Sequence, residues 1–339
     1  MAQPKMRAPV RCAVIGYGGA FNMGHAHANW LAEQRGFELT TIMDIDKTRE
    51  PIAKENFPQA EFYSSLTRML DKAPVDLVSI VTPHNTHAAI AIKCLEAGKH
   101  VVVEKPMCIT VKEATAMIEA AKKSKVLLTV FHNRRLDGDF LTTKSMIDKG
   151  MIGDIFHIEA YMGGFGRPGG WWRADKKISG GALYDWGAHF VDWVLNLVDS
   201  KIENVTGFFY KLRWHNVTNE DHTEAVVRFK NGAVADIQQS GLSRIGKPRW
   251  RILGTHGAIL NEGGDHIRVY SEVKGIPCES RVRCQRTDWG QWYPKLADTL
   301  LRGKPLFVTP ESARRVIGVI ETAEKSSKSG KAEKAPYEE

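Results

Sequence analysis

The sequence predicts two domains of different class: an α/β domain with a parallel sheet, then an α+β domain with an open, mainly antiparallel sheet. Between residues 11 and 131, continuous apolar runs alternate with helical segments. After about residue 155, strand-like runs instead alternate apolar and polar residues, and Asn231-Gly232 separates two of them. A chain of 339 residues is long enough for two cores. We place the domains at residues 1–133 and 134–339, with the boundary between these two kinds of sequence pattern at residues 133–150.

Most strands expected in the first domain are continuous runs of largely apolar residues. A parallel sheet covered by helices buries its strands on both faces, so these strands lack apolar–polar alternation. Thr110 is a suitable N-cap for one intervening helix, and Gly98 is suited to follow the end of another. The expected strands are 11–16, 37–43, 75–81, 100–103 and 126–131, and the expected helices are 24–34, 88–97 and 110–124.

The second domain is expected to contain a sheet with one exposed face, because such a sheet produces alternating strands. An Asn-Gly pair between two of these strands predicts a tight hairpin. The expected strands are 225–229, 233–237, 250–254 and 258–260, and the expected helices are 181–197 and 309–327. The end of the chain, Lys325–Glu339, is rich in Lys, Ser and Glu and is expected to be a partly ordered tail.

Charge, apolar runs and cysteine content argue against some classes of function. The net charge of +8 is spread along the sequence without interleaved aromatic residues, so we expect no nucleic-acid partner. No apolar run approaches the length of a membrane span and the N-terminus lacks a signal region, so we expect no membrane association. Five scattered cysteines without a Cys-x-x-Cys pair favour free thiols and a cytoplasmic location.

A glycine-rich turn, Gly16-Tyr-Gly18-Gly19, follows the first expected strand. At such a strand–turn–helix junction, backbone N–H groups and the helix N-terminus can face a pyrophosphate. The usual Gly-x-Gly-x-x-Gly pattern is interrupted, and Gly24 fills its third position only after an insertion of three residues. The alternative is an ordinary βα turn. The residues assigned to the cofactor in this loop are Gly16, Gly18, Gly19, Phe21 and Asn22.

Asp44 ends the second expected strand and follows Gly24 by 20 residues. A carboxylate at this spacing accepts hydrogen bonds from the 2′-hydroxyl of the adenosine ribose and repels a 2′-phosphate. Arg49 lies too far along the chain to reverse this preference. The expected cofactor is therefore NAD, with NADP less favoured.

Two further loops follow strands at the same predicted edge of the sheet, where ligands of such folds bind. One is the stretch 82–87 and the other is Glu104-Lys105-Pro106. Lysine is rarely buried without a partner or a task, and a cation here would polarise a substrate hydroxyl. The alternatives are a capped helix start and a Glu–Lys pair at a surface turn. The residues assigned to the cofactor in these loops are Thr82, Pro83, Asn85, His87, Glu104 and Lys105.

Asp185 and His189 are four residues apart in a helix expected to begin near Gly181, and they therefore share one face. Histidine has the right pKa range to take the proton of an alcohol as hydride leaves. A core or capping histidine is the alternative, against which the flanking glycines argue. A metal site that adds Asp192 has no recognised ligand spacing, so we expect no metal.

A glycine-rich loop with paired tryptophans occupies residues 163–173. Such a loop suits a sugar, because aromatic rings stack on its C–H faces while polar groups bind its hydroxyls. The alternative is a pair of tryptophans that anchors a flexible loop in the core.

Four stretches together resemble the Gfo/Idh/MocA family, named for glucose–fructose oxidoreductase, inositol dehydrogenase and rhizopine catabolism. They are AVIGYGG, DLVSIVTPHNTHAAIAIKCLEAGKHVVVEKP, SGGALYDWGAHFVDW and ILGTHGAIL, and the resemblance spans about residues 10–330. It implies an N-terminal Rossmann domain, a C-terminal α+β domain and NAD(P)-dependent oxidation or reduction at a sugar, polyol or related carbon. The departures are the stretched glycine loop and Trp186, where a smaller residue is common.

The resemblance also implies roles for single residues. Lys105 matches the family's catalytic lysine, and Asp185 and His189 match its Asp and His. Asp44 matches the ribose acid, and Trp172-Arg173 matches the Trp-Arg pair before the helix. We further assign Asn133, Trp172 and Arg173 to the cofactor, and Arg135, Tyr161, Trp171, Asp185 and His189 to the substrate.

We therefore predict an NAD-dependent oxidoreductase that transfers hydride between nicotinamide and a hydroxyl or keto carbon of a sugar, polyol or sugar derivative. In this interpretation His189 removes the hydroxyl proton, Lys105 stabilises the developing alkoxide, and Asp185 orients one of them. Two alternatives stay open: a redox-assisted glycosidase or lyase without net NADH, and a non-catalytic nucleotide-sensing regulatory protein. The sheet around residues 225–240 is expected to pair with another subunit, giving a homodimer or homotetramer.

Overall fold

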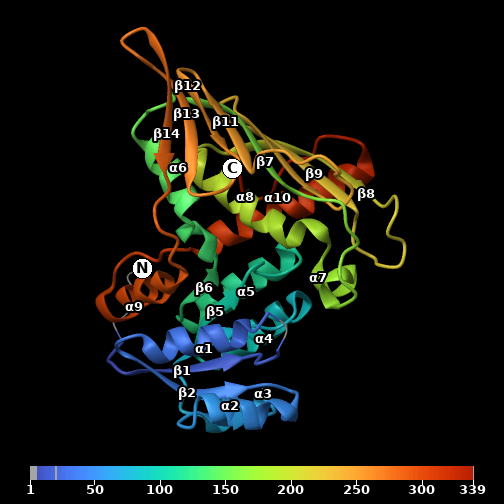
Figure 1. The fold of residues 1–339 in the computed structure, drawn as a ribbon. Coiled ribbons are helices and arrows are strands. Elements are labelled where there is room, and N and C mark those ends of the chain that lie inside the picture. Colours follow the sequence, from blue (N-terminus) through green and yellow to red (C-terminus); the bar gives the residue numbers. More distant parts are fainter. Residues whose placement is uncertain (1–5, 20, 339) are drawn as a thin grey trace. The chain divides into compact units, whose positions relative to one another are not determined.

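The computed structural model describes residues 6–19 and 21–338, and the chain divides into two compact units, each with its own sheet (Figure 1). The first unit consists of Met1–Cys108, Lys112–Phe131 and Gly290–Ala313. The second consists of Ile109–Val111, His132–Trp289 and Arg314–Glu339. The predicted division differs from these units at residues 290–313, which it assigned to the second domain, and at residues 109–111 and 132–133, which it assigned to the first.

The first unit contains a sheet of six parallel strands in the order β3-β2-β1-β4-β5-β6. The predicted parallel sheet is thus confirmed. Strand order reverses between β1 and β4, and ligands of such sheets bind outside the carboxyl ends of the strands at this point. The strands are β1 (Val10–Ile15), β2 (Phe37–Met43), β3 (Glu61–Tyr63), β4 (Leu77–Ile80), β5 (His100–Glu104) and β6 (Leu128–Phe131).

The helix that returns late in the sequence, α9 (Trp292–Arg302), packs on the first unit beside α1 (Figure 1). The Trp292 and Phe131 ring centroids are 4.9 Å apart, and those of Trp30 and Tyr293 are 6.3 Å apart. Buried aromatic contacts of this kind explain why α9 belongs to this unit. The other helices here are α1 (Met23–Glu33), η1 (Lys47–Arg49), α2 (Glu50–Asn56), α3 (Leu66–Lys72), η2 (His84–Thr86), α4 (His87–Glu96) and α5 (Val111–Ser124).

The second unit contains an eight-stranded sheet in the order β14-β13-β12-β11-β7-β10-β9-β8. β7 and β10 pair in parallel and the other neighbours are antiparallel, which confirms the predicted mainly antiparallel sheet. The strands are β7 (Ile155–Gly163), β8 (Ile202–Tyr210), β9 (His222–Phe229), β10 (Val234–Ser240), β11 (Trp250–Gly254), β12 (Gly257–Asn261), β13 (His266–Val273) and β14 (Ile276–Arg283).

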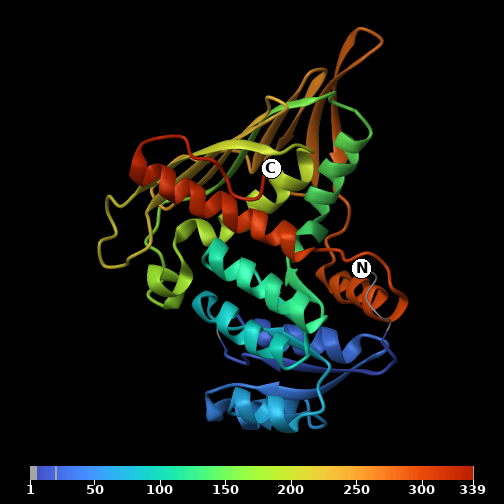
Figure 2. The same cartoon turned by 180° about the vertical axis from the view of Figure 1, so that it is seen from behind.

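Helices α6, α8 and the later part of α10 lie along one face of this sheet (Figure 2). Trp193 of α8 contacts Trp250 of β11, with ring centroids 5.0 Å apart. A Cβ at Gly207 would lie 1.9 Å from the Ala323 carbonyl oxygen, so only glycine lets α10 approach β8 this closely. The helices are η3 (Asn133–Leu136), α6 (Gly138–Asp148), η4 (Trp172–Ala174), α7 (Lys176–Ser179), η5 (Ala182–Tyr184), α8 (Trp186–Leu197), η6 (Trp289–Gln291) and α10 (Pro310–Ser329). None of the helices described is both long and apolar enough to span a membrane.

The C-terminal segment is more ordered than predicted. Helix α10 continues to Ser329, and Arg315 Nη2 lies 2.9 Å from the buried carboxylate of Glu338. The main chain of Glu333 also exchanges two hydrogen bonds with Val205. The prediction of a partly ordered tail is therefore wrong up to residue 338, because ion pairs and strand pairing hold this segment. Residue 339 lies outside the described residues.

Asp236 on β10 gives the second unit a pH-dependent stability. Burial and the nearby Glu224 carboxylate raise the pKa of Asp236 to about 7. Since an unfolded aspartate titrates near about 4, stability is fully present below that pH and falls as pH rises through about 7. We expect Asp236→Asn to melt at a higher temperature than the unmodified protein at about pH 8, with no gain at about pH 4. Thermal unfolding at both pH values is the measurement, and an equal shift at both would contradict this explanation.

Candidate active site

The glycine turn after β1 is tightly packed on one side and open on the other. A Cβ at Gly16 would lie 2.3 Å from the Val81 carbonyl oxygen, and a Cβ at Gly24 would lie 2.2 Å from that of Gly16. Gly24 thus performs the close helix–strand packing predicted for the third glycine. No atom would approach a Cβ at Gly18 within 4 Å. This open backbone beside the start of α1 fits a pyrophosphate.

The insertion in the glycine turn adopts a left-handed backbone. Phe21 has φ of +58° and Asn22 has φ of +54°, and Asn22 occupies the N-cap position of α1 without a side-chain capping bond. The Phe21 side chain is 66% exposed. These residues lie at the same turn as Gly16–Gly19, and their contact with a cofactor remains a prediction.

Asp44 joins the glycine turn to the loop after β2. One carboxylate oxygen accepts the Tyr17 N–H at 2.6 Å, and the other accepts the Asp46 N–H at 2.9 Å. Each oxygen keeps a second lone pair for a ribose hydroxyl. Arg49 is closer than the sequence indicated, because its Nη1 lies 3.1 Å from where a Cβ on Gly19 would be. This edge therefore carries both a carboxylate and a guanidinium.

Glu104 connects a buried network to the backbone of Lys105. One Glu104 oxygen lies 2.9 Å from His27 Nε2, and the other accepts the Lys105 N–H at 2.9 Å. His27 Nδ1 is 2.7 Å from the Tyr293 hydroxyl and 3.0 Å from the Ser79 hydroxyl. Burial opposes ionisation of Glu104, but the hydrogen bond from His27 and the charges of His27 and Lys105 lower its pKa overall. Glu104 is thus an anion that holds the Lys105 main chain.

His87 links the two loops at the carboxyl ends of β4 and β5. Its Nε2 lies 2.8 Å from the Thr82 carbonyl oxygen and its Nδ1 lies 2.9 Å from the Pro106 carbonyl oxygen. Carbonyl oxygens only accept, so the tautomer of the His87 ring decides which of these two nitrogens donates. The structure therefore places the buried His87 ring between two backbones. Asn85 is exposed at the same loop, and Pro83 begins its short helix.

We expect Glu104→Gln to lower kcat about tenfold with little change in dinucleotide affinity, since a hydrogen bond to a charged group contributes about 1.5–3 kcal/mol. The loss should appear in kcat, because the anion that holds the Lys105 main chain is gone. Tyr293→Phe should produce a smaller change in the same direction. Stopped-flow and steady-state kinetics, which separate kcat from dinucleotide affinity, test this positioning role. Variants that only melt earlier, with an unchanged kcat, would contradict it.

In the second unit, Arg173 binds Asp185. Its Nη1 donates to Asp185 Oδ1 at 3.1 Å, and its guanidinium lies 4.7 Å from the Trp172 ring centroid and 5.3 Å from that of Trp171. The structure thus brings together four residues that the sequence assigned separately to cofactor, substrate and catalysis. Asp185 precedes α8, which begins at Trp186, so the helix expected from Gly181 starts later. The intervening residues form η5, and Gly181 has φ of +132°.

His189 lies in the first turns of α8 and is buried. Its ring centroid is 5.8 Å from that of Trp186, and the Arg134 guanidinium lies 4.2 Å from the Trp186 ring centroid. The departure noted at Trp186 therefore has a structural consequence: this indole contacts both the Arg134 guanidinium and the His189 ring.

Arg135 forms a buried ion pair with Asp192. Its Nε and Nη2 donate to the two carboxylate oxygens at 2.8 and 2.6 Å. Burial opposes ionisation of Asp192, but His132 and Arg135 together lower its pKa. Both oxygens of Asp192 thus accept hydrogen bonds from the Arg135 guanidinium. Asn133 begins η3 beside these residues and is buried.

Tyr161 is not brought together with His189. Ala160 of β7 pairs with Trp250, which contacts α8 through Trp193. Since successive strand residues point to opposite faces, Tyr161 lies on the face away from α8, and its ring is 6.0 Å from Lys247 Nζ.

Sequence reasoning missed several residues of these networks. His27 and Tyr293 are 266 residues apart and meet only in the folded unit. From the sequence, Arg135 is assigned to the substrate and its neighbour Arg134 is not assigned. In the structure Arg135 pairs with Asp192, whereas Arg134 lies near the Trp186 ring. Within the described ranges, no group of His, Cys, Asp and Glu has the arrangement of a metal site.

Comparisons with known proteins agree with this geometry. A model of the oxidoreductase family with an NAD-binding Rossmann fold matches residues 10–132, and the GFO/IDH/MocA C-terminal domain matches residues 140–260. The scyllo-inositol 2-dehydrogenase (NAD(+)) of Bacillus subtilis is 32% identical, over 75% of this chain and 74% of that protein. The scyllo-inositol 2-dehydrogenase (NADP(+)) IolW of the same organism is 29% identical, over 94% of each chain.

A solved NAD-binding protein from Listeria innocua has the same fold, with a TM-score of 0.83 and 28% identity over 96% of this chain and 97% of that one. The match extends through both units, as do the two family models. The chain is thus a member of the Gfo/Idh/MocA oxidoreductase family, with an NAD(P)-binding Rossmann domain and the family's C-terminal domain.

Proposed function

We propose that this protein is an NAD(P)-dependent dehydrogenase that oxidises a CH–OH group of a cyclic polyol, sugar or sugar derivative. The observation that carries the proposal is the anchoring of Lys105 at the carboxyl end of β5 by the buried Glu104–His27 pair, at the sheet edge that also carries Asp44 and the glycine turn. Two relatives are scyllo-inositol dehydrogenases, so cyclic polyols are the first substrates to test.

The residues of the first unit fit a dinucleotide. The open backbone at Gly18 would face the pyrophosphate, and the remaining lone pairs of Asp44 would accept the adenosine ribose. When bound, the nicotinamide supplies a hydride acceptor.

In the proposed reaction, the Lys105 ammonium donates to the substrate oxygen and stabilises the negative charge that develops on it. His189 accepts the hydroxyl proton. Asp185, held by Arg173, accepts a hydrogen bond from a neighbouring substrate hydroxyl.

We propose NAD as the preferred dinucleotide, because Asp44 would repel a 2′-phosphate. Asp44→Ser should weaken NAD binding about tenfold, since hydrogen bonds to a charged acceptor contribute about 1.5–3 kcal/mol. The same variant should gain NADP affinity, because the carboxylate that would repel the 2′-phosphate is gone while the Arg49 guanidinium near Gly19 remains. Titration of Asp44→Ser and of Asp44→Ser/Arg49→Ala with both dinucleotides is the measurement. An equal loss of affinity for both dinucleotides in Asp44→Ser would contradict this role of Asp44.

The activity itself is tested by incubating the protein with NAD or NADP and a panel of scyllo-inositol, myo-inositol, sugars and glycosides. Reduced dinucleotide that accumulates with a polyol or sugar supports the proposal. Glycoside cleavage without net reduced dinucleotide would instead favour the redox-assisted glycosidase, and no turnover of any kind would favour a regulatory protein.

A further inference from the structure

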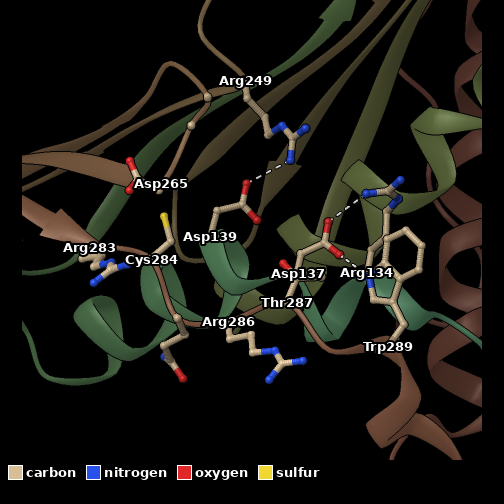
Figure 3. A pocket seen from close by; sticks show the side chains of 13 residues that line it. Arg134, Asp137, Asp139, Arg249, Asp265, Arg283, Cys284, Arg286, Thr287 and Trp289 are labelled. Carbon is tan, nitrogen blue, oxygen red and sulfur yellow. Dashed lines mark hydrogen bonds and ion pairs between the residues drawn. The ribbon is translucent and has the colours of Figure 1, made fainter.

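A cavity of about 880 Å³ lies within the second unit (Figure 3). It is lined by the start of α6, by Arg249, by the turn after β12 and by the segment after β14. The lining includes four arginines and three aspartates, namely Arg134, Arg249, Arg283, Arg286, Asp137, Asp139 and Asp265.

Close backbone contacts and hydrogen bonds hold the wall of the cavity in place. A Cβ at Gly138 would lie 1.7 Å from the Gln285 carbonyl oxygen, so the segment after β14 crosses directly over the start of α6. Two hydrogen bonds fasten this crossing: Gly138 N–H donates to Thr287 Oγ1 at 2.9 Å, and Gln285 N–H donates to Thr142 Oγ1 at 2.8 Å. The arginines of this segment are therefore held at the cavity by its backbone.

Protein groups already engage the carboxylates of the cavity. Asp137 accepts from Arg134 at 2.8 Å and from Trp289 Nε1 at 2.6 Å (Figure 3). Asp139 accepts from Arg249 at 2.9 Å, from the amide of Asn261 and from a backbone N–H. The third carboxylate, Asp265, lies 2.7 Å from His266 Nδ1.

The guanidinium groups that line the cavity have more N–H donors than their ion pairs use. Each guanidinium carries five N–H donors, and Arg134 and Arg249 each give a carboxylate only part of this capacity. Arg283 and Arg286 are exposed and form no ion pair within residues 6–19 and 21–338. Four cations against three anions leave one positive charge in surplus. The cavity thus lacks acceptors and favours a ligand that brings oxygen atoms with negative charge.

Arg134 links the cavity lining to the segment that carries the candidate catalytic residues of the same unit. Its guanidinium lies 4.2 Å from the Trp186 ring centroid and 5.0 Å from that of Trp289. Trp186 follows Asp185 directly, and its ring contacts that of His189. A substrate that reacts at Asp185 and His189 can therefore extend towards the arginines.

From these contacts we propose that the cavity binds the anionic group of the substrate, which makes the substrate a sugar or polyol bearing a carboxylate or a phosphate. The inference rests on the proposed function for the reaction, but binding to the cavity does not. Guanidinium pairs match both oxyanions, and the flanking indoles suit the C–H face of a sugar ring.

Calorimetry without dinucleotide tests the cavity on the full chain, with glucuronate, glucose 6-phosphate and glucose as ligands. We expect one of the two anions to bind at least about tenfold more tightly than glucose, and the tighter anion identifies carboxylate or phosphate. Arg283→Ala/Arg286→Ala should abolish that difference. Arg281→Ala is the matched control, because it removes an exposed arginine from the same strand outside the cavity.

The salt dependence of binding to the unmodified protein gives a second readout, and affinity for the anion should fall as ionic strength rises. Equal affinity for glucose and both anions, or an unchanged advantage in the double variant, would overturn the proposal. Anion binding without any redox turnover would support the cavity and count against the dehydrogenase. Turnover of neutral polyols without anion binding would support the dehydrogenase and count against the cavity as an anion site.

Discussion

Replacement of Lys105 by methionine is expected to lower kcat about a thousandfold, because removal of one positioned donor to a developing oxyanion costs about 2.7–4 kcal/mol. Methionine keeps the length and most of the apolar stem of lysine and removes only the charge. The Lys105 backbone bond to Glu104 is retained in the variant, so the loop should keep its conformation. Steady-state kinetics with the best polyol found in the panel measures the effect.

Dinucleotide affinity of the Lys105 variant should stay near that of the unmodified protein, since Gly18 and Asp44 are untouched. Lys93→Met provides the control, because Lys93 is an exposed lysine on α4 of the same unit. The control should turn over normally. A Lys105→Met enzyme that keeps its turnover within about tenfold would remove Lys105 from the catalytic step.

The second large effect is expected on stability, from Arg135→Met. This change removes the guanidinium from the buried Asp192 carboxylate and leaves it with the more distant His132, whose Nδ1 lies 3.8 Å away. Breaking a buried pair in this way costs about 3–5 kcal/mol. The loss should appear as a lower midpoint in urea unfolding. A second change, Asp192→Leu, should restore most of the stability, because two well-packed apolar side chains replace the pair.

An exposed ion pair in the same unit offers a comparison for the Arg135 effect. Arg228 lies 3.1 Å from Glu203, with both side chains more than half exposed. Arg228→Met should cost less than about 1 kcal/mol, since solvent screens such pairs. If Arg135→Met cost no more than Arg228→Met, the Arg135–Asp192 pair would not be the anchor that its geometry indicates.

Five strands of the first sheet could be predicted to within a few residues, because burial on both faces makes them rich in apolar residues. The short β3 (Glu61–Tyr63) was not expected. β2 agrees with its expected range of 37–43. β14 could not be found this way, since Ile276–Arg283 is exposed along most of its length and carries no apolar pattern. The sequence also could not show that α9 belongs to the first unit. An amphipathic pattern predicts that one face of a helix is buried, but not which sheet that face packs against.

The same distinction applies to the candidate site: some of its residues can be located from local sequence, and others come together only on folding. Residues that directly follow a strand, such as Asp44 and Lys105, could be located from the sequence because parallel strands end at a common edge. Contacts between distant segments, such as His27 with Tyr293, arise only on folding. Adjacent arginines of a short 3₁₀ helix could not be told apart: Arg135 is buried on Asp192 and Arg134 lines the cavity.

The most direct test of the account is to follow the hydrogen itself. The protein is incubated with NAD or NADP and with scyllo-inositol, glucuronate and glucose 6-phosphate that carry deuterium on their ring carbons, and the reduced dinucleotide is examined by mass spectrometry. The account predicts one deuterium at nicotinamide C4 for each molecule of keto product, and no label with Lys105→Met. Product that forms while the dinucleotide stays unlabelled would contradict hydride transfer as the reaction of this site.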